Sequence, residues 1–249
     1  GDFEESVRNA AKAGVDALII QDLGGARIAR TVCPDIELHA STQLTACNLE
    51  DVKALEALGF SRVVLARELS MAEIEYICEN CNAEIEVFAH GALCVCMSGK
   101  CLMSSFIGMR SGNRGACAQP CRQLYSAEGK KGYFLSPRDL CLADEISALR
   151  KAGVKSIKIE GRMKSAYYTA VVTNAYRAAI DGYIEKGADY RFDECWLREL
   201  DSVSHREYCT GYYFDDPMQN PQLVSECGYL REKAYYSTAI EYDSTEADA

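Results

Sequence analysis

Short apolar runs rich in β-branched residues recur along the chain, and they limit the folds that are open to it. Amphipathic helical patterns such as residues 44–59 and 70–81 lie between most of these runs. Apolar strands that alternate with helices predict a parallel sheet covered by helices. The runs are "DALIIQD" (16–22), "IELHAST" (36–42), "SRVVLAR" (61–67), "EIEVFAH" (84–90), "GYFLSP" (132–137) and "SIKIEG" (156–161).

The even spacing of the runs favours one kind of parallel sheet. The early runs start 20 to 25 residues apart, and no Gly-rich dinucleotide fingerprint follows any of them. We therefore expect an α/β fold, a (β/α)8 TIM-type barrel truncated at the N-terminus with about six βα units present. Residues 1–214 would form this incomplete barrel, with a long helix at 165–187. Residues 215–249 would be a linker and the beginning of a C-terminal β domain.

Polar residues follow the predicted strands. In parallel barrels the loops at the carboxyl ends of the strands build the active site. The loop after residue 90 is far longer than the usual two to six residues, and loops of that length are usually functional. The polar strand-end residues are Asp22, His39, Arg67, His90, Arg138 and Glu160.

This long loop concentrates cysteines. The chain has 13 cysteines, an odd number, so they cannot all form internal disulfides. Within the loop the spacing is Cys94-x6-Cys101-x15-Cys117-x3-Cys121, and Cys141 follows in "LSPRDLC". Four converging thiolates hold either structural zinc or an iron–sulfur cluster, and spacing alone does not separate the two or exclude buried packing thiols. With no export signal visible, we expect a reducing, cytoplasmic location.

Charge is distributed unevenly. The net charge is −10, yet residues 100–164 carry thirteen Lys and Arg against five Asp and Glu. This pattern predicts a basic region on an acidic body, with chance clustering on a solvated surface as the alternative. No apolar run approaches the roughly 20 residues of a membrane-spanning helix, so no membrane partner is expected.

Protease motifs are absent from the sequence. Neither HExxH nor GxSxG occurs. A cysteine peptidase would need a Cys–His pair, and His90, four residues before Cys94, is the one histidine close to it in sequence.

Several motifs resemble the signature of the collagenase-like peptidase family U32. They are "EVFAHGALCVCMSGKCLMSSFIGMRSGNRGACAQPCR", "HASTQ" (39–43), "FLSPRDLC" (134–141) and "KIEGRMKS" (158–165). Iron–sulfur members of this family support oxygen-independent hydroxylation, either of RNA bases or of a quinone precursor. With "SGNRGACAQPCR" this sequence more closely resembles the RNA branch, which uses prephenate as co-substrate. The resemblance implies a substrate such as tRNA wobble uridine or an rRNA cytidine, and a possible partner protein of the same family.

The resemblance also implies roles for individual residues. Cys94, Cys101, Cys117 and Cys141 would ligate a 4Fe-4S cluster, with Cys121 competing for the fourth place. From their positions at the strand ends, and not from the resemblance, we expect His39, Glu160 and Arg162 to be catalytic, and Arg67 and His90 to bind the cofactor or the small acid. The alternatives are an ion pair of Glu160 with Arg162 or Lys158, and a purely structural role for the two histidines. The basic region 100–164 would bind tRNA or rRNA, mainly through Arg110, Arg114, Arg122 and Arg162. A collagenase-like peptidase of the cysteine type is the alternative.

Overall fold

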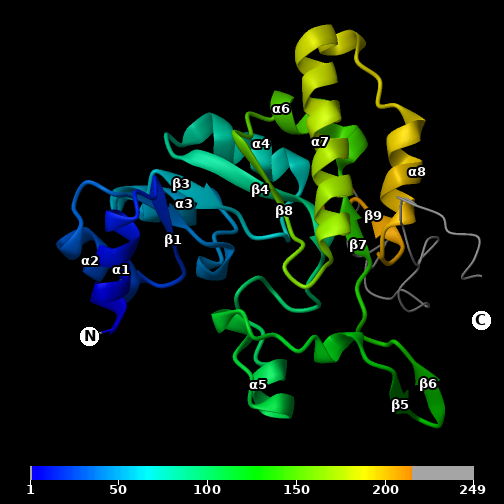
Figure 1. The fold of residues 1–249 in the computed structure, drawn as a ribbon, viewed down its shortest axis with the longest axis horizontal. Coiled ribbons are helices and arrows are strands. Elements are labelled where there is room, and N and C mark those ends of the chain that lie inside the picture. Colours follow the sequence, from blue (N-terminus) through cyan, green and yellow to red (C-terminus); the bar gives the residue numbers. More distant parts are fainter. Residues whose placement is uncertain (1, 215–249) are drawn as a thin grey trace, which may run out of the picture.

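Strands and helices alternate through the first part of the computed structural model, which describes residues 2–214 (Figure 1). The strands are β1 (Ala17–Ile20), β2 (Glu37–Ala40), β3 (Arg62–Val64) and β4 (Glu84–Ala92). The helices are α1 (Asp2–Lys12), α2 (Leu23–Val32), α3 (Leu49–Ala57) and α4 (Met71–Asn80). The first four predicted strands are thereby confirmed.

The second part of the chain is less regular. It contains α5 (Met103–Gly108), β5 (Tyr125–Ala127), β6 (Lys130–Gly132), β7 (Asp139–Cys141), α6 (Ile146–Lys151), β8 (Ser156–Ile159), α7 (Ala166–Lys186), α8 (Glu194–Ser202) and β9 (Tyr208–Cys209). Short 3-10 turns are η1 (Thr42–Leu44), η2 (Gly112–Arg114), η3 (Pro120–Arg122), η4 (Ala143–Glu145) and η5 (Gly187–Asp189). In Figure 1, α5 and the β5–β6 hairpin lie below the main sheet.

One sheet organises the described residues. Its order is β1-β2-β3-β4-β7-β9, and β8 also pairs with β4. Strands β1 to β4 are parallel neighbours, and β8 is parallel to β4. Within residues 2–214, β1 pairs with β2 alone, so the sheet has an open edge. The parallel α/β architecture is confirmed, whereas a complete eight-stranded barrel is not; the expected β domain at 215–249 lies outside the described residues.

The strand predicted at 132–137 is wrong. Gly132 is the last residue of β6 in the β5–β6 hairpin, and the next strand begins only at Asp139. Pro137 has no N–H to donate to a strand ladder, which prevents regular pairing through this segment. Strand β7 instead runs antiparallel to β4, with His90 opposite Cys141. Arg138 therefore precedes a strand, and it forms an exposed ion pair with Glu207 at 3.4 Å.

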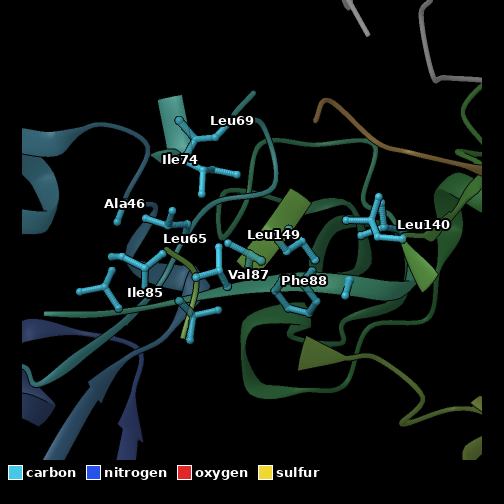
Figure 2. Packing of buried hydrophobic residues seen from close by; sticks show 14 of the residues in the cluster. Ala46, Leu65, Leu69, Ile74, Ile85, Val87, Phe88, Leu140 and Leu149 are labelled. Atoms are coloured by element: carbon cyan, nitrogen blue, oxygen red, sulfur yellow. The ribbon is translucent and has the colours of Figure 1, made fainter. Parts of the chain in front are cut away.

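The hydrophobic core lies between the sheet and its helices. Figure 2 shows Leu65, Ile85 and Val87 packed close to Ile74 of α4 and Leu149 of α6. All of these side chains are buried. Since neighbouring strand residues point to opposite faces, Ile85 and Val87 enter this core while Glu84 and Glu86 face the other way.

The other face of the sheet is charged. Arg62 donates to Glu84 at 2.9 Å through Nε, and Lys158 donates to Glu86 at 3.0 Å. These pairs join β3, β4 and β8 side by side. No helix of residues 2–214 is long and apolar enough to cross a membrane.

Side-chain caps fix where the helices begin. Ser70 and Glu73 form a capping box at α4, and Ser165 caps α7 by accepting from the Tyr168 amide. Asp22, which was expected among the active-site residues, accepts from the Gly25 amide at 2.7 Å and caps α2.

A buried hydroxyl fastens α7 to the sheet. Tyr176 donates to the Ala89 carbonyl at 2.7 Å and accepts from the Leu142 amide at 3.0 Å. We expect Tyr176→Phe to lower the free energy of unfolding by about 1 kcal/mol, because a buried hydrogen bond is lost. Urea denaturation checks this, with exposed Tyr76→Phe as the control. Equal unfolding midpoints for the two variants would contradict the assignment.

Candidate functional site

A cavity of about 310 Å³ lies where the long loop between β4 and β7 meets the carboxyl ends of four parallel strands. Gln43 follows β2, Arg67 follows β3, Leu93 follows β4 and Glu160 follows β8. The loop supplies the rest of the wall from α5, η2 and η3. Four cysteines line the cavity: Cys94, Cys101, Cys117 and Cys121.

The four thiols differ in exposure. Burial raises the pKa of Cys94 and of Cys121, while Arg67 acts against the rise at Cys94 and Arg122 against the rise at Cys121. Cys117 is exposed. Its sulfur accepts from the Gln119 amide at 3.3 Å and lies 3.6 Å from the Ser104 hydroxyl.

Cys141 lies apart from this set. It sits in β7 opposite His90 and does not line the cavity. Burial raises its pKa to about 11. Three of the four cysteines predicted as ligands, Cys94, Cys101 and Cys117, therefore line one cavity together with Cys121, whereas the fourth, Cys141, does not.

The spacing of the thiols does not suit a single metal ion. Among residues 2–214, no group of three or more His, Cys, Asp or Glu side chains is close enough to hold one ion. Thiolates around tetrahedral zinc lie about 3.8 Å apart, given Zn–S bonds of ~2.3 Å. A cluster keeps its four thiolates further apart because several irons separate them.

Three arginines surround the cavity. Arg67 donates to the Ala92 carbonyl at 3.2 Å, and its guanidinium lies 4.9 Å from the centre of the Phe88 ring. Its Nε is buried without a hydrogen-bond partner in the described part of the chain. Arg122 donates to the Leu93 carbonyl at 2.7 Å. Buried, incompletely bonded cations favour an anionic occupant.

Arg162 occupies space that a glycine leaves open. Gly115 has φ +75°, and a Cβ there would overlap the Arg162 guanidinium. The Arg162 amide donates to the Glu160 carboxylate at 3.1 Å. Both residues line the cavity, so these two predicted catalytic side chains lie beside the thiols.

Asp139 is the important residue that sequence reasoning missed. Its carboxylate is 1% exposed and lies 3.5 Å from Arg122, 3.5 Å from Arg206 and 3.7 Å from Lys164. Burial raises the pKa of Asp139, although Arg122 and Lys164 oppose the rise. The sequence signal that could have found it is an aspartate at the start of the short strand β7, since a charged residue in a buried strand needs ionic partners. Arg122, expected at the RNA, is buried in this group.

The predicted histidines lie outside the cavity. His39 is on β2, with Nε2 3.4 Å from the Glu37 carboxylate. His90 is buried with its ring close to Tyr168, Tyr176 and Tyr208. The His90 contacts include the Tyr176 hydroxyl at 3.4 Å, whereas no contact joins it to Cys94. The Cys94–His90 pair that a cysteine peptidase would require is not formed.

A second cavity of about 380 Å³ adjoins the first. It shares Cys117, Gln119 and Met163 with the thiol cavity. Arg110 and Lys164 also line it. Cys117 therefore borders a second recess, which is lined by the basic side chains of Arg110 and Lys164.

Comparison with known proteins gives a consistent family match. A family model described as "Peptidase family U32" matches residues 1–222. The chain is 34% identical to "tRNA hydroxylation protein P1" of Bacillus subtilis (strain 168), over 97% of this chain and 60% of that protein. It is 43% identical to "23S rRNA 5-hydroxycytidine C2501 synthase" of Escherichia coli (strain K12), over 72% of this chain and 28% of that protein. It is also 34% identical to "Collagenase" of Porphyromonas gingivalis (strain ATCC BAA-308 / W83), over 94% of this chain and 61% of that protein. The chain spans less than two thirds of each relative.

The buried histidine makes acid stability predictable. Burial lowers the pKa of His90 to about 3, so the folded state holds it neutral while the unfolded chain protonates it below about pH 6.5. Its stabilising contribution is therefore present above pH 6.5 and is lost as the pH falls toward 3. Between pH 7.5 and 5 we expect a loss of about 2 kcal/mol that His90→Phe does not show. Urea titrations at both pH values measure it, and equal losses in both proteins would contradict the prediction.

Proposed function

Because the chain belongs to peptidase family U32, as its motifs indicated, we propose that it is an enzyme that hydroxylates an RNA base with a 4Fe-4S cluster bound at Cys94, Cys101, Cys117 and Cys121. The observation that carries this proposal is the convergence of four thiols, with buried arginines, in one cavity at the sheet end. Relatives named for tRNA and rRNA hydroxylation support the reaction class.

The donor set fits such a cluster. Four cysteine thiolates are its usual ligands, and hydrogen bonds to the sulfurs tune it. When bound, a cluster supplies electron transfer or activation of an oxygen donor. Arg67 and Arg122 would balance the negative charge of the thiolates, and the Gln119 amide already donates to Cys117.

The remaining cavity residues suit a small acid. Arg67 and Arg162 would hold the carboxylates of prephenate, because guanidinium groups bind carboxylates through paired hydrogen bonds. Glu160 would move a proton, and the hydrogen bond that its carboxylate accepts from the Arg162 backbone amide holds the carboxylate in position. His39 and His90 lie outside the cavity, so this scheme gives them no chemical step.

RNA would approach from the basic side. Arg110 lines the recess next to Cys117, and Arg114 belongs to η2 at the cavity wall. These two arginines would contact phosphates, whereas Arg162 is assigned to the small acid and Arg122 is occupied by Asp139 and Leu93. The target base has to be unpaired to reach the thiol cavity.

Anaerobic purification followed by iron, sulfide and zinc assays and a visible spectrum tests this proposal. We expect one four-iron, four-sulfide cluster per chain, lost in Cys117→Ala. We also expect the hydroxylated nucleoside to reappear, by mass spectrometry of digested RNA, when the full-length protein is returned to a strain that lacks it.

Other outcomes contradict the proposal. Zinc in place of iron would make the loop a structural centre. A folded, metal-free protein that cleaves gelatin and loses that activity in Cys94→Ala would favour the collagenase-like alternative. If the protein binds a cluster but does not restore the hydroxylated nucleoside, the metal site would be supported and RNA would be rejected as the substrate.

A further inference from the structure

Three exposed apolar side chains lie at the C-terminal end of the short helix α5, beside the thiol cavity. No part of the described chain covers them. We propose that this apolar tip, defined as Phe106, Ile107 and Met109, is a platform on which unpaired RNA nucleotides stack. The inference rests on the proposed function and adds to it the element that contacts bases, as distinct from phosphates.

The exposure of the tip is unusual for side chains of this kind. Phe106 is 82% exposed, Ile107 62% and Met109 93%. Large apolar groups gathered at one exposed place mark interaction sites more often than isolated ones do. All three fall within four consecutive residues at the end of α5.

Met109 stands where glycine would be easier to accommodate. It ends α5 in the left-handed region with φ +52°, and its amide donates to the Ser105 carbonyl at 3.1 Å. That position after a helix is usually glycine, because a Cβ is strained there. A methionine that is both strained and exposed contributes nothing evident to the fold, so we assign its side chain to binding.

The first turn of α5 ties the tip to the cavity. Met103 and Ser104 line the thiol cavity, and Ser104 is buried. The Ser104 hydroxyl accepts from the Ala118 amide at 2.9 Å, next to Cys117. A nucleotide held at the C-terminal end of α5 would therefore lie next to the cavity, on a helix whose first turn is anchored to the cavity wall.

Charge complementarity identifies the partner. Residues 97–135 carry six Lys and Arg against one Asp or Glu on a chain of net charge −10. Lys100, Arg110 and Arg114 belong to this segment. A polyanion with exposed flat apolar faces matches such a surface, and unpaired RNA is one because its bases stack on apolar and aromatic side chains. A second copy is disfavoured because a stable dimer needs about 800 Å² per partner, far more than three side chains offer.

RNA binding measured at several salt concentrations tests the platform. The probes are a stem–loop RNA with an unpaired loop and a fully paired duplex, with the full-length protein. We expect Phe106→Ala to weaken stem–loop binding about tenfold without changing the salt slope, because stacking releases no counterions. Arg110→Gln should instead lower the slope by about 0.7 to 1.

Met109→Gly separates binding from folding. Glycine relieves the left-handed strain, so its melting temperature should equal or exceed that of the wild type while stem–loop affinity falls. Ile184→Ala is the matched control, because Ile184 is 73% exposed near the far end of α7. That control should leave binding unchanged.

The results that overturn the inference differ from those that overturn the function. Wild-type binding to neither RNA would remove the RNA partner and the proposed function with it. Wild-type binding that Phe106→Ala and Met109→Gly leave intact would overturn the platform alone. A shift from oligomer to monomer in Phe106→Ala, with RNA affinity unchanged, would assign the tip to a second copy of the chain.

Discussion

The buried carboxylate of Asp139 is the contact on which the arrangement of the site depends. It joins Arg122 of the long loop, Lys164 at the entry to α7 and Arg206 before β9 to a single point on β7. Removing one member of a buried ion group leaves an uncompensated charge and costs about 3–5 kcal/mol. Arg122 is next to Cys121 in the chain, and it also donates to the carbonyl of Leu93, which precedes Cys94. The ion group of Asp139 therefore helps to position the thiols of Cys94 and Cys121.

The positive charges around the four thiols favour an anionic group in the cavity. Asp139 offers one negative charge to three cations, and Arg67 approaches the cavity from β3 with an unbonded Nε. Cations held this way are costly unless something negative completes them. Four thiolates on a cluster would do so, and a small carboxylic acid beside them would do so as well.

The sequence predicts the regular half of the molecule well and the site only partly. Residues 16–90 follow alternating and helical periods, so their strands could be placed from pattern alone. The stretch 132–137 was misread because Pro137 interrupts an otherwise strand-like run. The motifs favour Cys141 over Cys121 as the fourth ligand, whereas Cys121 and not Cys141 lines the cavity. The sequence does not show this difference, because it depends on where β7 pairs in the sheet. The burial of Arg122 was also invisible, because its partner Asp139 lies seventeen residues away in an apolar strand.

We propose that the loop thiols, and not the β7 thiol of Cys141, hold the metal. The most direct measurement compares iron and sulfide per chain in anaerobically purified Cys121→Ser and Cys141→Ser, with folding checked by circular dichroism. The account predicts that Cys121→Ser loses the cluster while Cys141→Ser keeps it. Retention in Cys121→Ser together with loss in folded Cys141→Ser would contradict it.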